Sequence, residues 1–523
     1  MAPSCATLDA LLAWLRARGA TGLCADSRQV RPGDAFVAWP GAAADARRFV
    51  RAALEAGAVA AVVEAQGLAG WLSAHPDAAF DLAPADAPSS ASRVAAYAGL
   101  RAAAGPLASA FWHAPSRALD LIAVTGTNGK TSTAWWTAQW LQAAGVGAGL
   151  IGTLGIGRPG AALVPTGLTT PDPVTLQRAL RAFADDGLRA VVLEASSIGI
   201  EEGRLDGARV HTAIFTNLTQ DHLDYHGTME AYWAAKRRLF DWPGLQVAVV
   251  CVDDPYGREL AQALAARPAD GGLDLWTYAT GPAATDARLR LLTREWLPNG
   301  ARFTVAEGAT HTTFEWPVVG DYNLGNLLAA MAVLRSSGLP WSAIVGASHG
   351  LTPVPGRMQS AWGAADGPAD GLPLVLVDYA HTPDAVDKAL QALRPLAARR
   401  GGRLWCVLGC GGDRDPGKRP LMAAAAEQGA DRVVLTSDNP RSEDPLQILA
   451  QMQAGLAAPA RAWVEPDRAA AIDRAVREAQ ARDVVLLAGK GHEDYQEIAG
   501  VRRPFSDLDH ARAALRRRRE ANA

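Results

Sequence analysis

One short segment, Thr125–Thr131, constrains the fold of this 523-residue chain more than any other feature. It reads TGTNGKT, follows the apolar run Leu121–Val124 and precedes the helical stretch Ser132–Ala144. In such a strand-loop-helix unit, glycines let backbone N–H groups converge on phosphate oxygens, and the helix N-terminus adds positive potential. Lys130 can reach terminal phosphates and Thr131 can ligate magnesium, although valine stands where the general motif has its first glycine. The segment therefore predicts a nucleotide-binding α/β domain; the alternative is a glycine-rich turn with a surface lysine.

Short apolar runs alternate with helical stretches along most of the chain, which is typical of α/β folds with largely parallel sheets. A chain of this length exceeds one ordinary core. We place boundaries after the alanine-rich helix Ala91–Ala104 and near the turn-rich stretch Gly338–Pro355. The fold class predicted is α/β with three domains, residues 1–105, 106–345 and 346–523, the central one a P-loop domain and the last Rossmann-like. The runs interpreted as strands include residues 121–124, 190–193, 246–252, 374–377, 404–408 and 432–435.

Charge and composition exclude several classes of protein. The formal net charge is -3, so bulk electrostatics favour neither nucleic acid nor anionic membrane as a partner. The amphipathic start, Met1–Gly19, lacks the uncharged core of a signal peptide, and no uncharged apolar run reaches the roughly 18 residues of a membrane span. Five scattered cysteines suggest a reducing compartment. We therefore predict a cytoplasmic protein without membrane insertion.

Two further predicted strands end in residues suited to a metal ion. Glu194 closes the apolar run Ala190–Leu193, at the edge where a parallel α/β sheet presents groups to a ligand. The predicted strand His211–Thr216 leads into Asn217–Gly227, a loop too rich in histidine and aspartate for turn chemistry alone. We interpret Glu194 as a magnesium ligand and this loop as a second metal position; a bland polar loop is the alternative.

These strings resemble the Mur ligases and their folylpolyglutamate synthase relatives. GTNGKT after an apolar strand is the form of the phosphate loop in that family, and Asn217–Gly227 resembles its TNxxxDHxDxHG loop. The resemblance runs from about Asp26 to Ser506, nearly the whole chain. It implies two magnesium ions as cofactors, with His222 as a ligand of the second.

The same resemblance gives a special role to Lys236, which taken alone is an ordinary surface lysine. It implies that the Lys236 amine is carbamylated by carbon dioxide. An ammonium group beside two magnesium ions would be pushed to its neutral amine, which can capture carbon dioxide and become an anionic ligand. The implied catalytic residues are Lys130, Glu194, His222 and Lys236, and the implied metal ligands are Thr131, Glu194, His222 and Lys236 as its carbamate.

The resemblance also implies that ATP is a co-substrate. Asn323 and Asn326 would read the adenine edge through their side-chain amides, while Arg357 and Asp378 would meet phosphate and ribose. Each of these, taken alone, is also compatible with a helix cap or surface turn. The implied ATP-binding residues are Gly126, Thr127, Asn128, Gly129, Lys130, Thr131, Ser132, Asn323, Asn326, Arg357 and Asp378.

The first domain carries a substrate signature. Asp26–Ala38 resembles the DSRxVxPGDxFVA string of members that act on the dipeptide and tripeptide precursors, which implies a UDP-binding domain. The chain departs from the family pattern at Ala46, Leu168 and Ile198, where glycine, asparagine and histidine are common. The residues implied for the UDP-linked dipeptide are Ala25, Ser27, Thr169, Thr170, Ser196, Glu202 and Arg204.

The third domain indicates the amino acid that is added. Asp438–Arg441 resembles the DNPR motif of the family members that add diaminopimelate. Diaminopimelate is lysine with one more carboxylate, and Arg441 can hold that group in a two-pronged, charge-assisted pair. Glu493 would pair with an ammonium group. The implied diaminopimelate-binding residues are Arg414, Asp438, Asn439, Pro440, Arg441, Gly489 and Glu493.

The resemblance implies a peptidoglycan-precursor ligase. ATP would phosphorylate the D-glutamate γ-carboxylate of UDP-N-acetylmuramoyl-L-alanyl-D-glutamate, and the amine of meso-diaminopimelate would attack the acyl phosphate. The expected partners are these three small molecules, and the enzyme is expected to be a monomer. A lysine-adding or folate-glutamylating ligase and a P-loop switch or motor are the alternatives.

Overall fold

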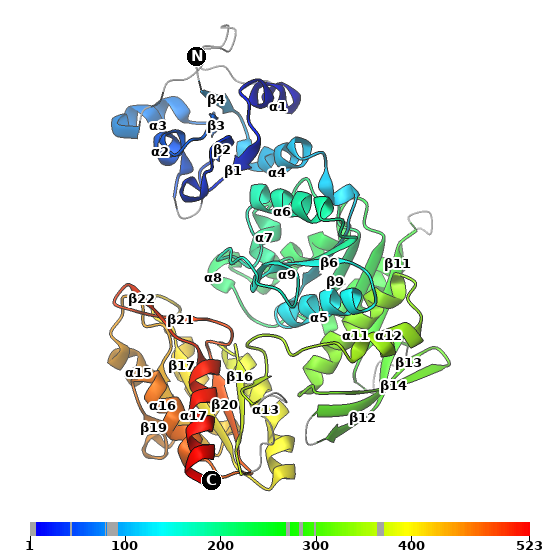
Figure 1. The fold of residues 1–523 in the computed structure, drawn as a ribbon, viewed down its shortest axis with the longest axis vertical. Helices are drawn as coiled ribbons and strands as arrows, with labels where there is room; N and C mark the ends of the chain where they lie inside the picture. Colours follow the sequence, from blue (N-terminus) through cyan, green and yellow to red (C-terminus); the bar gives the residue numbers. More distant parts are fainter. Residues whose placement is uncertain are drawn as a thin grey trace. The chain divides into compact units, whose positions relative to one another are not determined.

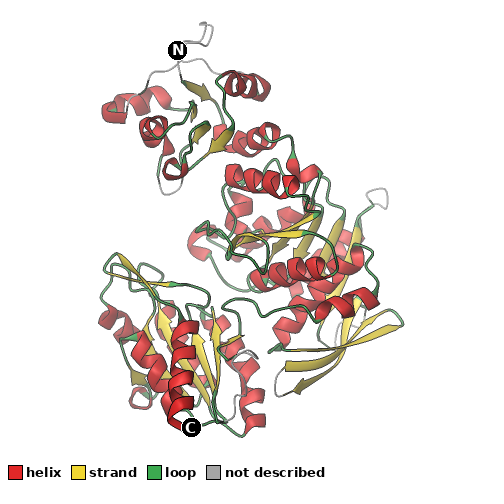
Figure 2. Ribbon diagram, viewed as in Figure 1, coloured by secondary structure: helices red, strands yellow, loops and turns green. Residues whose placement is uncertain are grey.

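The computed structural model describes residues 7–41, 44–78, 80, 93–267, 272–281, 286–297, 300–362 and 371–522. It falls into two compact units, Met1–Trp276 with Val333–Pro340 and Thr277–Ala332 with Trp341–Ala523. Both units combine strands with helices (Figures 1 and 2).

The first unit begins with a four-stranded parallel sheet. Its elements are α1 (Leu8–Ala17), β1 (Gly22–Cys24), β2 (Asp34–Ala38), α2 (Val50–Glu55), β3 (Ala60–Glu64), α3 (Leu68–Ala74), β4 (Val94–Tyr97) and α4 (Leu100–Phe111). The strand order is β1-β2-β3-β4, and every pair is parallel. Helices α1 and α4 pack in one apolar cluster with the sheet, and α2 and α3 pack in another. Both faces of the sheet are therefore covered, as parallel sheets require.

The helix predicted over Ala91–Ala104 is wrong. The described part of that stretch forms strand β4 and the start of α4, which continues through Gly105 and Pro106. A Cβ atom on Gly105 would lie 2.1 Å from the Asp206 carbonyl oxygen, so glycine is required where α4 passes that backbone. The boundary placed at residue 105 falls inside α4, and the three-domain division stays a prediction.

The phosphate-loop segment lies in a second, mostly parallel sheet of the same unit. Its elements are β5 (Asp120–Thr125), α5 (Lys130–Ala143), β6 (Ala148–Gly152), β7 (Gly155–Gly157), α6 (Pro173–Asp185), β8 (Ala190–Glu194), α7 (Ser197–Glu201), β9 (Thr212–Phe215), α8 (Leu223–His226), α9 (Met229–Arg237), β10 (Val247–Cys251) and α10 (Pro255–Ala265). These strands belong to a ten-stranded sheet, in which their order is β10-β9-β5-β8-β6-β7, and among them only β7 is antiparallel to its neighbour. Strand β5 lies between β8 and β9, so the ends of all three strands meet at one edge of the sheet.

The predicted strands in this sheet are confirmed, and buried side chains explain why they form. Strand β8 is buried along its whole length, as is typical of a parallel strand covered on both faces. Helix α5 packs on β6 and β8, whereas α6, α9 and α10 contribute to the main apolar cluster. Strand β11 (Asp274–Ala279) follows at the boundary between the two units.

The second unit contains an antiparallel meander that the sequence did not predict. It consists of β12 (Leu289–Leu297), β13 (Gly300–Glu307) and β14 (Thr310–Trp316), paired in that order. Helices α11 (Asp321–Ser336) and α12 (Trp341–Ser348) follow. Helix α12 lies inside the stretch Gly338–Pro355, which the sequence marks as turn-rich.

The C-terminal part of the second unit is a doubly wound sheet. Its elements are β15 (Gln359–Ser360), β16 (Leu374–Asp378), α13 (Pro383–Arg400), β17 (Leu404–Cys410), α14 (Lys418–Gly429), β18 (Arg432–Ser437), α15 (Pro445–Gln453), β19 (Trp463–Val464), α16 (Arg468–Glu478), β20 (Val484–Ala488), β21 (Tyr495–Ile498), β22 (Val501–Pro504) and α17 (Asp507–Asn522). The strand order is β15-β16-β20-β17-β18-β19, and β21 and β22 form a separate antiparallel hairpin. Helices α13, α14 and α15 share one core with this sheet, and α16 and α17 share another.

The α/β class is confirmed, with parallel pairs dominating the sheets. Within the described residues, every helix is too short or too polar to cross a membrane.

Candidate active site

The phosphate loop is tied to the segment that follows β9. A Cβ atom on Gly126, at φ 148°, would lie 1.9 Å from Thr216 Oγ1, so only glycine fits there. Thr216 Oγ1 donates to the Asn128 carbonyl at 2.6 Å, and the Thr127 amide donates to the Asn217 carbonyl at 2.8 Å. The Asn128 amide also donates to the Asn217 side-chain oxygen at 3.0 Å. The loop is thus held from outside by a neighbouring strand end.

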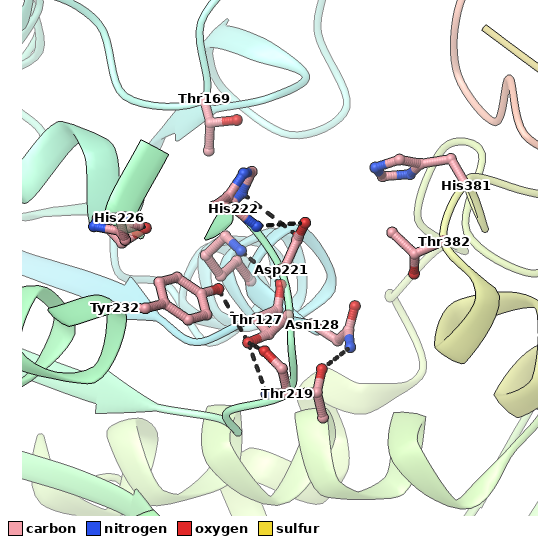
Figure 3. A network of polar contacts seen from close by, with 12 residues as sticks. Thr127, Asn128, Thr169, Thr219, Asp221, His222, His226, Tyr232, His381 and Thr382 are labelled. Atoms are coloured by element: carbon pink, nitrogen blue, oxygen red, sulfur yellow. Dashed lines mark hydrogen bonds and ion pairs between the residues drawn. The ribbon is translucent and has the colours of Figure 1, made fainter. Parts of the chain in front are cut away.

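Thr219 and Tyr232 also hold the phosphate loop, through contacts with the Thr127 hydroxyl (Figure 3). The Thr219 amide donates to Thr127 Oγ1 at 2.9 Å, and Thr127 Oγ1 also lies 3.1 Å from the Tyr232 hydroxyl. Tyr232 is buried, and burial raises the pKa of its hydroxyl, which therefore stays protonated. Sequence reasoning missed Thr219 and Tyr232, because neither belongs to the glycine-rich string.

Two lysines share one backbone acceptor in the loop. Lys130 Nζ donates to the Gly126 and Thr127 carbonyls, both at 2.8 Å, and Lys236 Nζ donates to the same Gly126 carbonyl at 2.8 Å. Lys236 is only 1% exposed, and its Nζ lies 4.4 Å from the centre of the Tyr232 ring. Burial first, and the charge of Lys130 second, hold the pKa of Lys236 well below its ordinary value. The lowered pKa favours the neutral amine of Lys236 next to the phosphate loop.

Thr131 and Glu194 have the donor groups that magnesium prefers. Thr131 Oγ1 donates to Glu194 Oε2 at 2.9 Å, and the Thr153 amide donates to Glu194 Oε1 at 2.8 Å. Glu194 is 1% exposed, and a Cβ atom on Gly152 would lie 2.2 Å from its Oε1. An oriented carboxylate beside a hydroxyl fits a hard cation that keeps other ligands from water and phosphate. These residues therefore fit one magnesium ion.

The loop predicted to hold a second ion places His222 beside an aspartate of the same loop. His222 directly precedes α8 and has a positive φ of 53°, and its Nε2 lies 3.5 Å from Asp221 Oδ2. Burial lowers the pKa of His222, so it is a neutral imidazole able to bind a metal. Among the described residues, no three histidine, cysteine or acidic side chains converge as a preformed cluster. The second ion stays a prediction.

The residues predicted for the peptide end of the substrate come together at the end of β8. Thr170 Oγ1 lies 2.9 Å from Ser196 Oγ and donates to the carbonyl that ends the strand at 2.8 Å. Arg204 Nη1 donates to the Thr170 carbonyl at 2.7 Å, and its guanidinium pairs with Glu202 at 2.5 Å. Thr169 Oγ1 contacts the hydroxyl of Thr153 at 3.1 Å. This network is polar, half-buried and adjacent to Glu194.

Two of the residues predicted for the UDP-linked dipeptide follow strand β1 of the same unit. Ala25 and Ser27 flank Asp26, which caps the short helix Ser27–Gln29 by accepting from the Arg28 amide at 3.0 Å. Of the three departures from the family pattern, Ala46 lies in a short helix capped by Asp45, and Ile198 lies in α7.

In the second unit, the residues predicted for adenine and ribose are engaged with protein groups. Asn323 Nδ2 donates to the Val319 carbonyl at 2.8 Å, and Asn326 Nδ2 donates to Asn323 Oδ1 at 3.2 Å. Asp378 accepts from two backbone amides at 2.8 and 2.9 Å. Arg357 lies over the ring of a neighbouring tyrosine, 4.4 Å from its centre. Asp378 thereby fixes the backbone beside Arg357.

Both arginines of the predicted amino-acid pocket approach Gly411, Arg441 with its guanidinium and Arg414 with its aliphatic stem. A Cβ atom on Gly411 would lie 3.0 Å from Arg441 Nη1 and 3.8 Å from Arg414 Cγ. Arg441 Nη1 donates to the Gly412 carbonyl, and a Cβ atom on Gly412 would lie 1.9 Å from the Pro440 carbonyl. Because Gly411 and Gly412 have no Cβ atom, the DNPR segment can pack directly against the loop after β17.

The acidic end of the same pocket is built around a lysine that sequence reasoning did not single out. Lys490 is fully buried, and its Nζ lies 3.1 Å from Glu493 Oε2, 3.1 Å from Asn439 Oδ1 and 3.9 Å from Asp438 Oδ1. A Cβ atom on Gly489 would lie 2.5 Å from Asp438 Oδ2, so glycine leaves room for that carboxylate. The fold therefore brings all the predicted acidic and amide residues of this pocket together.

Family models and known proteins agree on the family. A model of the Mur ligase middle domain matches residues 124–334, and one of the Mur ligase, glutamate ligase domain matches residues 356–491. A UDP-N-acetylmuramoyl-L-alanyl-D-glutamate–2,6-diaminopimelate ligase of Acidovorax sp. (strain JS42) is 52% identical over 98% of both chains. The protein of the same name from Pseudomonas aeruginosa is 46% identical over 94% of both chains.

Solved structures give the same answer. A structure of a UDP-N-acetylmuramoyl-L-alanyl-D-glutamate–2,6-diaminopimelate ligase matches with a TM-score of 0.63 and 36% identity over 95% of both chains. MurF from Acinetobacter baumannii, at 17% identity and a TM-score of 0.63, shares the fold. The chain belongs to the Mur ligase family.

Proposed function

We propose that this protein is an ATP-dependent ligase that adds meso-diaminopimelate to the D-glutamate γ-carboxylate of UDP-N-acetylmuramoyl-L-alanyl-D-glutamate. The relatives that match nearly the full chain at 46 to 52% identity carry that name. The structural observation that supports it best is the position of Arg441, whose guanidinium lies against Gly411 and donates to the Gly412 carbonyl. A guanidinium suits an amino acid with a carboxylate at its far end, which lysine lacks.

The reaction would proceed through an acyl phosphate. The γ-carboxylate of the dipeptide attacks the terminal phosphorus of ATP, and ADP leaves. The amine of diaminopimelate then attacks the acyl carbon, phosphate leaves, and the amine loses a proton as the amide forms.

The residues of the first unit would perform the phosphoryl-transfer step. Lys130 would exchange the Gly126 and Thr127 carbonyls for phosphate oxygens, because an anion is the stronger acceptor for an ammonium. Thr170, Ser196 and Arg204 would hold the peptide carboxylate. Phosphoryl transfer depends on alignment and charge neutralisation more than on covalent help, and these groups would supply the alignment and part of the positive charge.

Magnesium would neutralise phosphate charge, held by Thr131, Glu194, His222 and the carbamate of Lys236. Carbon dioxide reacts with a neutral amine, and burial, which lowers the pKa of Lys236, favours that form. The carbamate, the second ion, the monomeric state and the cytoplasmic location stay predictions.

The test is phosphate release with ATP, magnesium and the UDP-linked dipeptide, with either meso-diaminopimelate or L-lysine added. Release with diaminopimelate, with a product heavier by one residue, is expected. Release with L-lysine alone would make the protein a lysine-adding member of the family. Release that depends on neither amino acid would favour a P-loop switch or motor.

A further inference from the structure

Lys490 occupies an unusual position for a lysine. It follows β20, is 0% exposed, and contacts Asn439, Glu493 and Asp438 through one nitrogen. A buried ammonium is stable only when it is paired and hydrogen-bonded. All three of its polar neighbours belong to the predicted amino-acid pocket.

The charges around Lys490 do not cancel. Asp438 and Glu493 carry two negative charges against one positive charge, so the cluster has a surplus carboxylate. The charge of Arg468 also acts on Asp438 and Glu493, but Arg468 pairs with Asp507, and both side chains are 0% exposed, so this pair adds no net charge to the cluster. The side chain of Glu493 is 18% exposed, so the surplus is accessible to a small cation.

Asn439 connects this cluster to the hairpin of β21 and β22. Its Nδ2 donates to Glu493 Oε2 at 2.7 Å, while its Oδ1 accepts from Lys490 and, at 3.0 Å, from the Glu497 amide. The Glu497 carbonyl in turn accepts from the Arg441 amide at 2.9 Å. Lys490, Glu493 and Arg441 therefore belong to one continuous network.

We propose that Lys490 is a positioning residue for the incoming amino acid, holding Asp438 and Glu493 aligned so that their surplus charge captures the substrate ammonium beside the two arginines. Lys490 itself does not touch the substrate, because its nitrogen is already surrounded by protein acceptors. The proposal rests on the proposed function, since it deepens the role of the same pocket.

The chemistry of the pocket sets the expected readout. Burial and the Asp438 charge raise the pKa of Glu493, whereas Lys490 and Asn439 lower it. Removing the lysine removes a cation that lowers the pKa of Glu493, while the charges of Arg468 and Arg502, which also act on Glu493, remain. Capture of an ammonium should then weaken, and the acid limb of the pH profile should move upward.

The experiment compares Lys490→Met with Lys388→Met, which removes a lysine from an exposed ion pair with Asp384 on α13. We measure KM for diaminopimelate, ATP and the UDP-linked dipeptide, kcat, and the pH dependence of kcat/KM for diaminopimelate. Lys490→Gln, which keeps a hydrogen-bond donor, replaces the methionine variant if thermal unfolding shows that the latter is not folded.

The expected result is a rise of about tenfold or more in KM for diaminopimelate, with the other two KM values within about twofold, and an acid limb shifted up by about one pH unit. Lys388→Met should leave all of these values unchanged. A folded Lys490 variant with an unchanged KM for diaminopimelate and an unshifted acid limb would overturn the proposal. Failure of the proposed function is a separate outcome, because the wild-type enzyme would then release no phosphate in response to diaminopimelate.

Discussion

The clearest perturbation is Arg441→Met. Arg441 has a left-handed backbone, φ 54°, and its guanidinium donates to the Gly412 carbonyl. Two charge-assisted hydrogen bonds from Arg441 to a substrate carboxylate would each contribute about 1.5–3 kcal/mol to binding. Arg441 would have to break its hydrogen bond to the Gly412 carbonyl to form them, which reduces this gain by about 1 kcal/mol. The net loss is about 3 kcal/mol, or roughly a hundredfold in kcat/KM for diaminopimelate.

The assay is phosphate release at varied diaminopimelate, with the other substrates saturating. Arg441→Lys keeps the charge but loses the two-pronged geometry, so it should lose only about tenfold. Arg477→Met is the matched control, because Arg477 is 67% exposed and its ion-pair distances are 3.9 Å. It should behave as wild type.

The reasoning also predicts a change in selectivity. L-lysine has no far carboxylate, so its already low rate should not fall further in Arg441→Met. If kcat/KM for diaminopimelate falls less than about threefold in a folded variant, Arg441 does not bind the carboxylate.

Three further outcomes follow from other parts of the structure. Burial lowers the pKa of Lys236 well below 10.5, so at pH values between the folded-state pKa and 10.5 the unfolded chain binds a proton that the folded chain does not. Lys236→Met should therefore raise the melting temperature in buffer free of carbon dioxide, and this gain should become smaller as the pH approaches 10.5. Phosphate release should be lost in the same variant. An equal rise in melting temperature at all pH values would contradict the assigned pKa shift. Removing one partner of the buried Arg468–Asp507 pair should lower the free energy of unfolding by about 3–5 kcal/mol, and replacing both with apolar residues should lower it less, as urea titration would measure. Thr131→Val removes the hydroxyl bonded to Glu194, so the magnesium concentration for half-maximal phosphate release should rise about tenfold, whereas an unchanged requirement would exclude Thr131 as a ligand.

Sequence predicted the parts of the fold whose signals are local. The strand before Thr125, the phosphate loop and the strand that Glu194 closes all combine an apolar run with a specific polar end. The α/β class and the order of the sequence motifs along the chain followed from the same local signals.

The misses have physical causes. Strand β12 exposes most of its middle residues, so it lacks the apolar run that would mark it, and its pairing with β13 is a tertiary effect. Helix α4 was given the wrong bounds because Gly105 and Pro106 are typical helix breakers, yet the close approach to Asp206 favours glycine. The role of Lys490 was hidden because Asp438 and Asn439 lie far from it in the sequence.

The carbonyl oxygen of Gly126 accepts from both Lys130 and Lys236. Because this acceptor is a main-chain atom, no single amino-acid substitution can delete it, and a change at position 126 can only displace it. Natural variation can therefore alter either lysine separately while the shared anchor persists. Chemical synthesis could replace the amide between Gly126 and Thr127 by an ester, which would weaken the Gly126 carbonyl as an acceptor without adding a side chain. Backbone chemistry can therefore test this contact, whereas mutagenesis cannot.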